Sequence, residues 1–459
     1  MGKVFKDDYI AMARTVVTRT RNIAIPETLE FNFTADKIPT LDGGRPAILK
    51  EYRARAWDSY KRLSFPKTTD EPWRRTDLRK LDTRSFHLPE PGAFEDLPVV
   101  AGELLQPLVS DQHGGQIILL PGGSQVELST NLAGKGVIFS DLATAEREHS
   151  DVLAHVIGQI VRPDEGKFAA LAASLTQNGV LIYVPRGVQV EQPLHSVLWG
   201  PGVGLAHLSH VIVWLEEGAS LTYVHEAASP TEPGGQTLHA GIVEIHVGDG
   251  AQLRFVELQS WGEHVWNFSH ERARVGRDAN LDWVFVAVGS HLTKNFSDLD
   301  LNGQGATGRM SGFYFADGTQ HLDHDTQQNH LAPNTTSDLL FKGALKGHSR
   351  SVWQGMIYVA PGAQKTDGYQ ANRNLVLSSQ ARADSIPGLE IMADDVRCTH
   401  GATVGKINPE EVFYLRSRGI PNPDAERLIV EGFFDPIVQR VPFEGVRSRL
   451  EKSIAEKMG

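Results

Sequence analysis

The sequence predicts a mainly β protein whose core is a right-handed parallel β-helix, with helical segments flanking it at both ends. Three observations support this fold class. The chain has 459 residues, more than one hydrophobic core usually organises, so several domains or an elongated repeat are expected. From Gly179 onward, short runs of Val, Ile, Leu and Tyr alternate with Gly-containing turns, which is typical of strands. One kind of turn also recurs at a nearly constant spacing.

The recurring turn joins a residue that tolerates positive φ to a small residue. It occurs at Gly218-Ala219, Gly250-Ala251, Asp278-Ala279, Gly305-Ala306, Asn334-Thr335 and Gly362-Ala363. The second residues of consecutive pairs are 32, 28, 27, 29 and 28 positions apart. A fixed period of this size indicates a solenoid, in which each repeat buries its apolar face only when neighbouring repeats stack on it.

The content of the repeats favours a β-helix over other solenoids. Segments such as 221–225 and 253–257 are short, β-branched and aromatic, whereas helical repeats would show a period of 3.6 residues. A hexapeptide-repeat acyltransferase would show six-residue periodicity and coils of about 18 residues. A β-sandwich with Gly-rich turns is the remaining alternative, and the regular interval disfavours it.

The N-terminal region is expected to be helical and irregular. From Ile48 to Leu63, apolar residues recur at intervals of three and four, which predicts one buried helix face, and Pro66 closes this helix. A second helix is predicted from Asp141, as the N-cap, to about Val161. Its apolar stripe consists of Leu153, Val156, Ile157 and Ile160.

The C-terminal region returns to helix. Asn408 can cap a helix that has Pro409 in first position and Gly419 after its end. A second helix is expected from Pro423, and a third over residues 443–457 with an apolar stripe. We therefore predict three domains: helical and irregular residues 1–114, a β-helix over 115–405 with a helical excursion near 141–175, and helical residues 406–459.

Composition and charge narrow the function classes. The formal net charge of −11 argues against broad nucleic-acid binding, which needs Lys and Arg to neutralise phosphates. No segment has the roughly 20 apolar residues that cross a bilayer, and the N-terminus lacks the apolar core of a signal peptide. Its one cysteine, Cys398, can form no internal disulfide. We therefore expect a cytoplasmic protein with a protein partner and no membrane.

Several catalytic motifs are absent from the sequence. The nearest match to a phosphate-binding loop has Ser129 in place of the first Gly and Gly136 in place of the hydroxyl residue. There is also no His-Glu-x-x-His, Cys-x-x-Cys or Gly-x-Ser-x-Gly motif. We therefore expect that this chain does not hydrolyse ATP and is not an enzyme.

Two polar clusters are candidate metal sites. In the first, the segment 321–325 (His-Leu-Asp-His-Asp) is followed by His330 and offers imidazole and carboxylate ligands. On a strand, His321, Asp323 and Asp325 face one side and His324 the other. The favoured interpretation of this split set is a solvated strand.

The second cluster contains Cys398 and His400, two positions apart in a predicted strand. Both side chains then point to one face, where a thiolate and an imidazole could bind a soft or borderline metal ion. Two ligands do not complete a tetrahedral site, so the others would come from elsewhere, including another chain. From the residues alone, a buried cysteine beside a hydrogen-bonded histidine is the favoured interpretation.

Six segments, taken in order, resemble the SufB/SufD family of iron–sulfur cluster assembly proteins. They are EPWRRTDL (71–78), GVLIYVPRGV (179–188), WNFS (266–269), RA (272–273), HLAPNT (330–335) and FYLRSRGI (413–420). SufB-like members carry a cysteine proposed as a cluster or sulfur acceptor, and the corresponding position here, with Pro387 as the anchor, is Asn372. Residues 398–403 instead resemble the SufD branch, which implies His400, and less strongly Cys398, as interfacial ligands of iron or cluster.

The resemblance also implies a scaffold function and partners. The family forms a complex of one SufB, one SufD and two copies of the ABC-type ATPase SufC. A transient iron–sulfur cluster or iron is expected at the interface with the SufB-like paralogue, with none tightly bound to the isolated chain, which alone could form a homodimer. The SufC-like ATPase is expected on the C-terminal helices, at Phe413, Tyr414, Leu415, Leu428, Ile429, Phe433 and Phe434.

Two rival functions remain at this point. A polysaccharide lyase or hydrolase on a β-helix would present acidic clusters along an exposed face, but such substrates are usually extracellular. A purely structural adaptor without a cluster role is the other rival.

Overall fold

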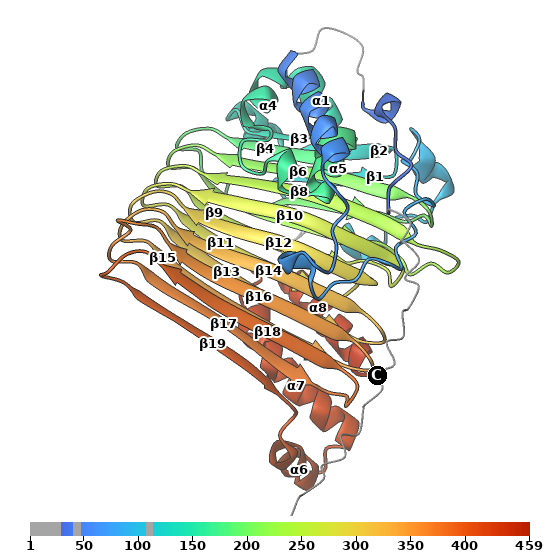
Figure 1. The fold of residues 1–459 in the computed structure, drawn as a ribbon, viewed down its shortest axis with the longest axis vertical. Helices are drawn as coiled ribbons and strands as arrows, with labels where there is room; N and C mark the ends of the chain where they lie inside the picture. Colours follow the sequence, from blue (N-terminus) through green and yellow to red (C-terminus); the bar gives the residue numbers. More distant parts are fainter. Residues whose placement is uncertain (1–28, 40–46, 107–112) are drawn as a thin grey trace, which may run out of the picture.

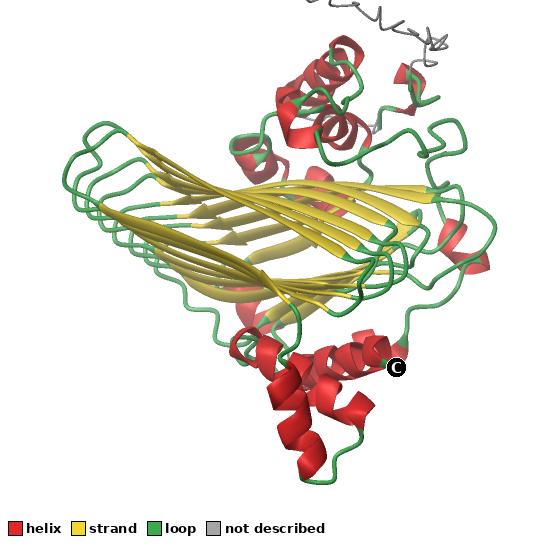
Figure 2. Ribbon diagram, turned by 60° about the horizontal axis from the view of Figure 1, so that its bottom comes forward, coloured by secondary structure: helices red, strands yellow, loops and turns green. Residues whose placement is uncertain are grey.

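A computed structural model describes residues 29–39, 47–106 and 113–459 of the chain. Its centre is a β-helix in which successive coils build two long sheets, one lying over the other (Figure 1, Figure 2). Residues 1–28 of the predicted N-terminal region and the side chain of Ile48 lie outside the described residues.

Each sheet is named by its number of strands. In sequence order, the ten-stranded sheet contains β1 (Gly115–Leu120), β2 (Gly123–Leu128), β5 (Leu194–Trp199), β7 (Ser220–Ala228), β9 (Gln252–Ser260), β11 (Asn280–Ala287), β13 (Thr307–Ala316), β15 (Thr336–Leu345), β17 (Asp367–Val376) and β19 (Arg397–Gly405). The nine-stranded sheet contains β3 (Ile138–Asp141), β4 (Asn178–Val184), β6 (Ala206–Leu215), β8 (Thr237–Val247), β10 (Val265–Val275), β12 (Leu292–Leu301), β14 (His321–His330), β16 (Arg350–Val359) and β18 (Arg382–Ile391).

From β4 onward, strands that follow one another in the chain alternate between the two sheets, and neighbours within a sheet run parallel. In the ten-stranded sheet, for example, Leu281 of β11 pairs with Leu253 of β9 and with Gly308 of β13. Antiparallel pairs occur at the N-terminal end, where β2 pairs with β1 and β3 with β4. These ladders confirm the predicted parallel β-helix, and the β-sandwich alternative is wrong.

Five of the six predicted turn pairs stack on one another at one corner of the coils. Their first residues, Gly218, Gly250, Asp278, Gly305 and Asn334, have φ of 67°, 66°, 53°, 76° and 60°. Each donates its backbone N–H to the residue that precedes the next turn, as Gly250 does to the carbonyl of Arg277 at 2.8 Å. The second residues are buried between coils, which explains why they are small.

The sixth predicted pair, Gly362-Ala363, is wrong by three residues. Asn334 donates its N–H to the carbonyl of Gln364 at 2.8 Å, and Lys365 has φ of 61°. The hydroxyl of Thr366 lies 3.3 Å from that of Thr335. The turn after β16 spans 360–366, whereas the turn after β14 spans 331–335. The longer turn moves the stacked pair to Lys365-Thr366.

Alternate residues of each strand fill the space between the two sheets, which we call the lumen. In β11, Leu281, Trp283 and Phe285 belong to this central core, whereas Val284 and Val286 face the outside. Because the strands pair in register, the neighbours of these residues on other strands face the same way.

The N-terminal helices are η1 (Ala35–Lys37), α1 (Ala47–Arg62), η2 (Glu71–Trp73), η3 (Ala93–Asp96), η4 (Gly102–Leu104), α2 (Thr130–Gly134), α3 (Leu142–Glu148), α4 (Ser150–Val156), η5 (Pro163–Glu165) and α5 (Lys167–Leu175). Of these, α1, α3, α4 and α5 cover the outer face of the nine-stranded sheet (Figure 1). The segment that contains η3 and η4 packs on the ten-stranded sheet, and Leu132 of α2 belongs to the central core. The buried face of α1 contains Leu49, Tyr52, Ala56, Trp57 and Tyr60, as predicted.

The predicted single helix from Asp141 to Val161 is wrong in its extent. Asp141 does cap α3, accepting the N–H of Thr144 at 3.0 Å, but α3 ends at Glu148 and α4 at Val156. The buried carboxylate of Glu244 then accepts the backbone N–H groups of Gly158, Ile160 and Val161 at 2.7, 2.7 and 3.1 Å. A buried carboxylate needs such donors, so this contact with β8 competes with continuation of the helix.

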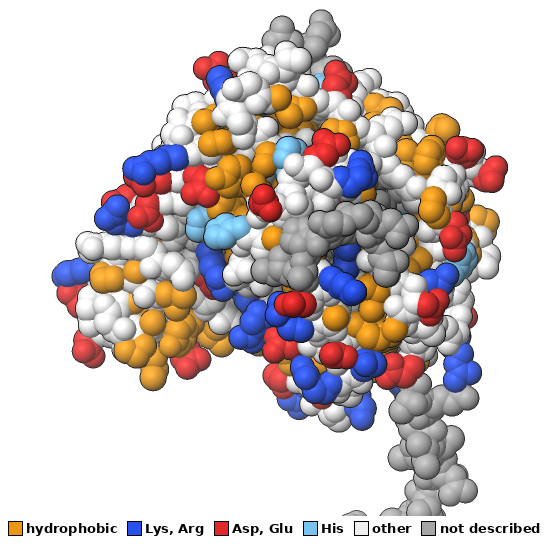
Figure 3. Space-filling view, turned by 90° about the horizontal axis from the view of Figure 1, so that it is seen from above, with side chains coloured by type: hydrophobic (Ala, Val, Ile, Leu, Met, Phe, Trp, Pro, Cys, Tyr) orange, Lys and Arg blue, Asp and Glu red, His pale blue; other side chains and the backbone are white. Residues whose placement is uncertain are grey.

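The C-terminal helices are α6 (Pro409–Ser417), α7 (Asn422–Val438) and α8 (Glu444–Met458), close to their predicted positions. Asn408 accepts the N–H of Glu410 at 3.0 Å, as an N-cap. α7 and α8 pack on the outer face of the ten-stranded sheet and leave the last coil uncovered (Figure 2). None of the helices in the described ranges is long and apolar enough to cross a membrane. On the face in Figure 3, acidic and basic side chains are interspersed.

Candidate functional site at the open end of the β-helix

The last coil ends the β-helix with two exposed strands. β18 and β19 are the terminal strands of their sheets, and within the described ranges neither has a strand on its outer side. Leu389, Ile391 and Val404 on these strands are 37%, 39% and 50% exposed, whereas the lumen residues of inner strands are buried. Unpaired N–H and C=O groups beside exposed apolar side chains form an edge to which another strand can add.

Cys398 and His400 both lie on the lumen side of β19. β19 pairs in register with β17, so Cys398 lies beside Gly368 and His400 beside Gln370. The same register continues through Ser337 and Gly308 to Leu281, which faces the lumen. Cys398 is half-buried and His400 is exposed at the mouth of the lumen. The favoured interpretation of a buried pair is therefore wrong for His400.

The surroundings of Cys398 make its thiol a weak nucleophile. It packs against a small apolar cluster that includes Ile357 and Val359. A Cβ on Gly368 would lie 3.3 Å from the sulfur of Cys398 and 3.3 Å from Nε2 of His330, so a larger residue there would press on both groups. Burial raises the pKa of Cys398, which keeps the thiol protonated at neutral pH.

A hydrogen-bonded network of neutral groups fills the lumen behind the last coil. Tyr314 donates to Oδ1 of Asn374 at 2.7 Å, and Nδ2 of Asn374 donates to Oδ1 of Asn372 at 2.6 Å. Ser385 of β18 donates to the same oxygen of Asn372 and thereby joins the two sheets. Asn372, the position that the resemblance aligns with the SufB cysteine, is thus a fully buried amide with fixed partners.

The segment 321–325 is neither a solvated strand nor a metal site. Asp323 is fully buried, and Nζ of the buried Lys294 lies 2.9 Å from Asp323 and 2.9 Å from Asp325. Thr76 donates to Asp323 and lies 2.9 Å from Nε2 of His321. The described residues contain no group of three or more His, Cys, Asp or Glu side chains that could hold a metal ion. The prediction of a solvated strand is wrong because the segment that contains Thr76 covers these side chains.

His324 points to the other side of β14, as predicted, and lies buried in the lumen. Its ring stacks on Tyr314 with the centroids 5.3 Å apart. Burial lowers the pKa of His324 to about 3, so the ring is neutral. His330 is also buried in the lumen, and its two ring nitrogens lie 2.7 and 2.8 Å from the hydroxyls of Thr335 and Ser337.

The covering segment is the one that carries the motif EPWRRTDL. Trp73 packs against Phe268 and Phe296, at centroid distances of 6.0 and 5.8 Å. Arg350 donates to the carbonyl of Arg75 at 3.2 Å. Sequence reasoning missed Lys294 as the counter-ion. The segments 71–78 and 321–325 lie more than 200 residues apart, so their presence in the sequence was the only signal for the contact between Thr76 and Asp323.

The C-terminal helices present only part of the predicted partner surface. Phe413, Tyr414 and Leu428 are 72%, 56% and 43% exposed, and Leu415, Ile429 and Phe433 are half-buried. Phe434 is fully buried, with its ring 4.6 Å from that of Phe313 in β13. Its assignment to the partner surface is therefore wrong, because that side chain fastens α7 to the sheet.

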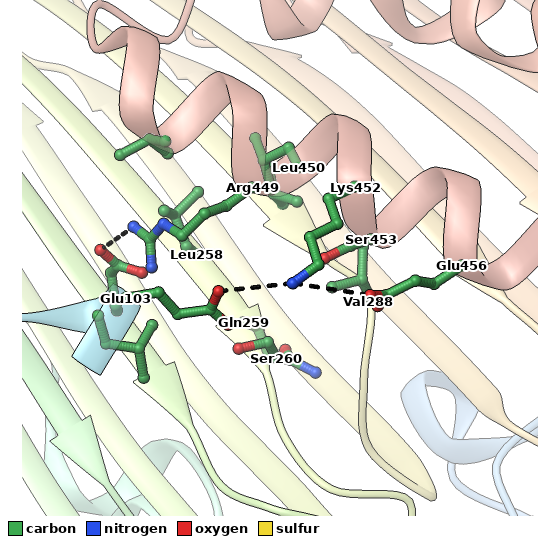
Figure 4. Close-up of a pocket in the computed structure, with 14 residues that line it drawn as sticks. Glu103, Leu258, Gln259, Ser260, Val288, Arg449, Leu450, Lys452, Ser453 and Glu456 are labelled. Atoms are coloured by element: carbon green, nitrogen blue, oxygen red, sulfur yellow. Dashed lines mark hydrogen bonds and ion pairs between the residues drawn. The ribbon is translucent and has the colours of Figure 1, made fainter. Parts of the chain in front are cut away.

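A pocket between α8 and the ten-stranded sheet is lined by ion pairs (Figure 4). Arg449 of α8 lies 2.6 Å from the buried carboxylate of Glu226, which also lies 2.9 Å from Nε2 of His195. Lys452 lies 3.8 Å from Glu103 and 3.9 Å from Glu456. Arg449 therefore joins α8 to the sheet, and Lys452 joins it to η4.

The chain is thus a β-helix protein whose C-terminal end is uncovered and carries the exposed His400. Two sequence families match it: "SUF system FeS cluster assembly, SufBD core domain" over residues 200–433 and "SufBD protein N-terminal region" over residues 32–195. The chain belongs to the SufB/SufD family of iron–sulfur cluster assembly proteins, as predicted.

Individual relatives agree with the predicted branch. The chain is 32% identical over 421 residues to the iron–sulfur cluster assembly protein SufD of Bacillus subtilis, covering 90% of this chain and 94% of that protein. It is 31% identical over 320 residues to SufB of the same organism, covering 69% and 68%. A SufBD family protein of Staphylococcus epidermidis matches to the same extent as SufB. The match to SufD thus extends over parts of the chain that the match to SufB leaves out.

Proposed function

We propose that this chain is a SufD-like scaffold subunit that works in the cytoplasm and supports nascent cluster formation at an interface with a SufB-like paralogue. The observation that carries the proposal is the open end of the β-helix, where the exposed His400 lies at the mouth of the lumen. The iron–sulfur cluster is the cargo of this assembly, held transiently at the interface. The proposed role is structural and ligating, not enzymatic.

The uncovered edges favour a partner with the same architecture. β18 and β19 end the two sheets side by side, so a partner with a matching pair of edges can continue both sheets at once. A paralogue with the same β-helix has such a pair. A second copy of this chain also has one, so a homodimer is the expected assembly in the absence of the paralogue.

His400 is the better of the two proposed interfacial ligands. A neutral imidazole suits iron and zinc, and the exposed ring of His400 can reach a group held by another chain. Cys398 is half-buried, and burial raises the pKa of its thiol, so it would have to lose a proton before it could bind a metal. The remaining ligands would come from the partner, since two do not complete a four-coordinate site.

The proposed contact with the SufC-like ATPase lies on α6 and the start of α7. Phe413, Tyr414 and Leu428 form an exposed apolar surface there. Arg418 lies 5.0 Å from the ring centre of Tyr414, and such aromatic–arginine pairs are typical of interface anchors. α7 continues into the buried Phe434, so movement of the bound ATPase would be passed to the ten-stranded sheet.

The test of the ligand role is His400→Ala in the assembled complex. We expect a loss of cluster content, measured by iron and sulfide analysis and visible absorption, while the isolated chain stays folded. Thr399→Ala is the matched control, because Thr399 is exposed on the same strand but faces away from the lumen. Equal cluster content in the His400→Ala complex and in wild type would contradict the proposal. Cys398→Ser should cause a smaller loss.

The test of the ATPase contact is a double substitution, Phe413→Ser with Tyr414→Ser, in a pull-down with the cognate ATPase. Neither side chain is buried, so the chain should fold normally and lose most ATPase binding. Val99→Ser, at a residue that is 88% exposed far from α6, is the control. Truncation after residue 407 would instead uncover the apolar face beneath α7 and α8, so it is the less informative experiment. Full ATPase binding by the double variant would place the contact elsewhere.

A further inference from the structure

Gln370 of β17 lies next to His400 and has an unused hydrogen-bond acceptor. The register of β17 and β19 places these two residues side by side, and both face the lumen. Gln370 is fully buried. Its Nε2 donates to the carbonyl of Gly388 at 2.8 Å and more weakly to that of Gly355 at 3.4 Å. Its Oε1 has no hydrogen-bond partner in the part of the chain that the structure describes.

The amide of Gln370 crosses the lumen beneath the last coil. It starts on the ten-stranded sheet and ends at the carbonyls of β16 and β18 in the other sheet. Oε1 lies 2.5 Å from the point that a Cβ on Gly355 would occupy, so a glycine there makes room for the amide. The strand spacing of about 4.8 Å brings the ring of His400 within reach of this amide.

A buried carbonyl oxygen without a donor is costly, so a donor is expected close by. Trp353 has an unpaired, buried Nε1–H in the same region, yet in the packed interior it does not bond to Gln370. His400 is exposed on β19 at the mouth of the lumen, so its ring can change rotamer without displacing a buried neighbour. Of the two donors, only His400 can still turn toward the amide.

We propose that Gln370 is the positioning residue for His400. Its Oε1 accepts one ring N–H of His400, which selects one tautomer and directs the other ring nitrogen, with its lone pair, out of the lumen. Metal-binding histidines are commonly held by a carbonyl or carboxylate oxygen in this way. The inference rests on the proposed function in one respect only: the outward nitrogen is the one offered to iron or cluster at the interface.

The experiment measures the tautomer of His400 in the full-length isolated chain, with ¹⁵N-labelled histidine and NMR at pH 8. His400→Ala identifies the signals. Gln370→Met keeps the length of the side chain and removes the acceptor, whereas Gln370→Glu keeps an acceptor oxygen. We expect a single tautomer in wild type and in Gln370→Glu, and a mixture of both tautomers in Gln370→Met. A loss of packing alone would not separate the Glu variant from the Met variant.

Two results would overturn the inference. One is an unchanged His400 tautomer in Gln370→Met. The other is a shift of the Trp353 indole N–H signal in that variant with His400 unaffected, which would assign the acceptor to Trp353. In the assembled complex, Gln370→Met should weaken cluster retention by roughly 10-fold or more, as loss of an orienting partner does at other metal sites. A changed tautomer with unchanged cluster content would support the positioning role and count against His400 as a cluster ligand.

Discussion

The two ends of the β-helix differ in how they finish the same pair of sheets. At the N-terminal end, β2 and β3 pair antiparallel to their neighbours, and helices α1, α3, α4 and α5 cover the nine-stranded sheet. At the C-terminal end, β18 and β19 continue the parallel repeat and stop without a cover. A solenoid needs a cap wherever it meets water, so the uncapped end is where a partner is expected. The comparison distinguishes residues that stabilise the isolated chain from residues that are available to bind a partner.

The closed end should carry the larger share of stability. Phe168 of α5 is 1% exposed and stacks on Phe268 at 3.7 Å, so Phe168→Ala should cost about 3–5 kcal/mol in the free energy of unfolding. Leu389→Ala at the open end should cost less than about 1 kcal/mol, since Leu389 is 37% exposed. Urea unfolding of the isolated chain measures both. Similar losses of stability in the two variants would contradict the expected difference between the two ends.

The C-terminal helices should also contribute to the stability of the isolated chain, through the ion pair of Arg449. Arg449→Met leaves the buried carboxylate of Glu226 with His195 as its remaining partner, which should cost about 3 kcal/mol. Lys452→Met, at a side chain that is 64% exposed, is the control and should change stability by less than about 0.5 kcal/mol. Thermal unfolding, monitored by circular dichroism, compares the two variants. A small effect of Arg449→Met would mean that apolar packing alone holds α8.

The same ion pair predicts a dependence on acid. Burial by itself would raise the pKa of Glu226, but hydrogen bonds and charge from His195 and Arg449 outweigh it and hold the pKa below its usual value. The stabilisation is therefore present at neutral pH and is lost as the pH falls below the usual range for a glutamate. In Arg449→Met this acid sensitivity should be weaker than in wild type.

Between the two ends, a pair of carboxyl groups in the lumen should make the middle coils less stable at higher pH. Glu257 of β9 and Glu271 of β10 are buried, and burial raises the pKa of both, to about 6 for Glu271. The folded chain thus keeps protons that the unfolded chain releases near pH 4.5, so stability falls as the pH rises through about 6. Glu257→Gln should raise the free energy of unfolding at pH 8 by about 1–2 kcal/mol, and by less at pH 5. Melting curves at the two pH values measure this, and an equal gain at both would count against the shared burial of charge.

The smallest effect on folding is expected at the open edge itself. Val404→Lys places a charge on β19 and should change the stability of the isolated chain by less than about 0.5 kcal/mol. It should nevertheless abolish end-to-end association, measured by light scattering after size exclusion. Val126→Lys is the matched control, because Val126 is 45% exposed on β2 at the other end of the same sheet, against 50% for Val404. Loss of association in both variants, or in neither, would contradict the assignment of the open end.

The predictions that succeeded rest on local rules. A positive φ at Gly218 or Asn334 and a small residue after it are properties of neighbouring positions, so the repeat and the β-helix are visible in the sequence. The cap at Asn408 and the shared face of Cys398 and His400 also follow from neighbours alone. The family, too, is evident from motifs that keep their order.

What only the tertiary structure decided depends on contacts between distant parts of the chain. Thr76 and Asp323 are 247 positions apart, and Lys294 and Asp323 are 29 apart, so no local pattern shows that these carboxylates are covered and neutralised. The end of α4 is set by Glu244 on β8, and the burial of Phe434 by Phe313 on β13. Buried charges and apolar faces find their partners through packing, and the sequence lists the groups without the distances between them.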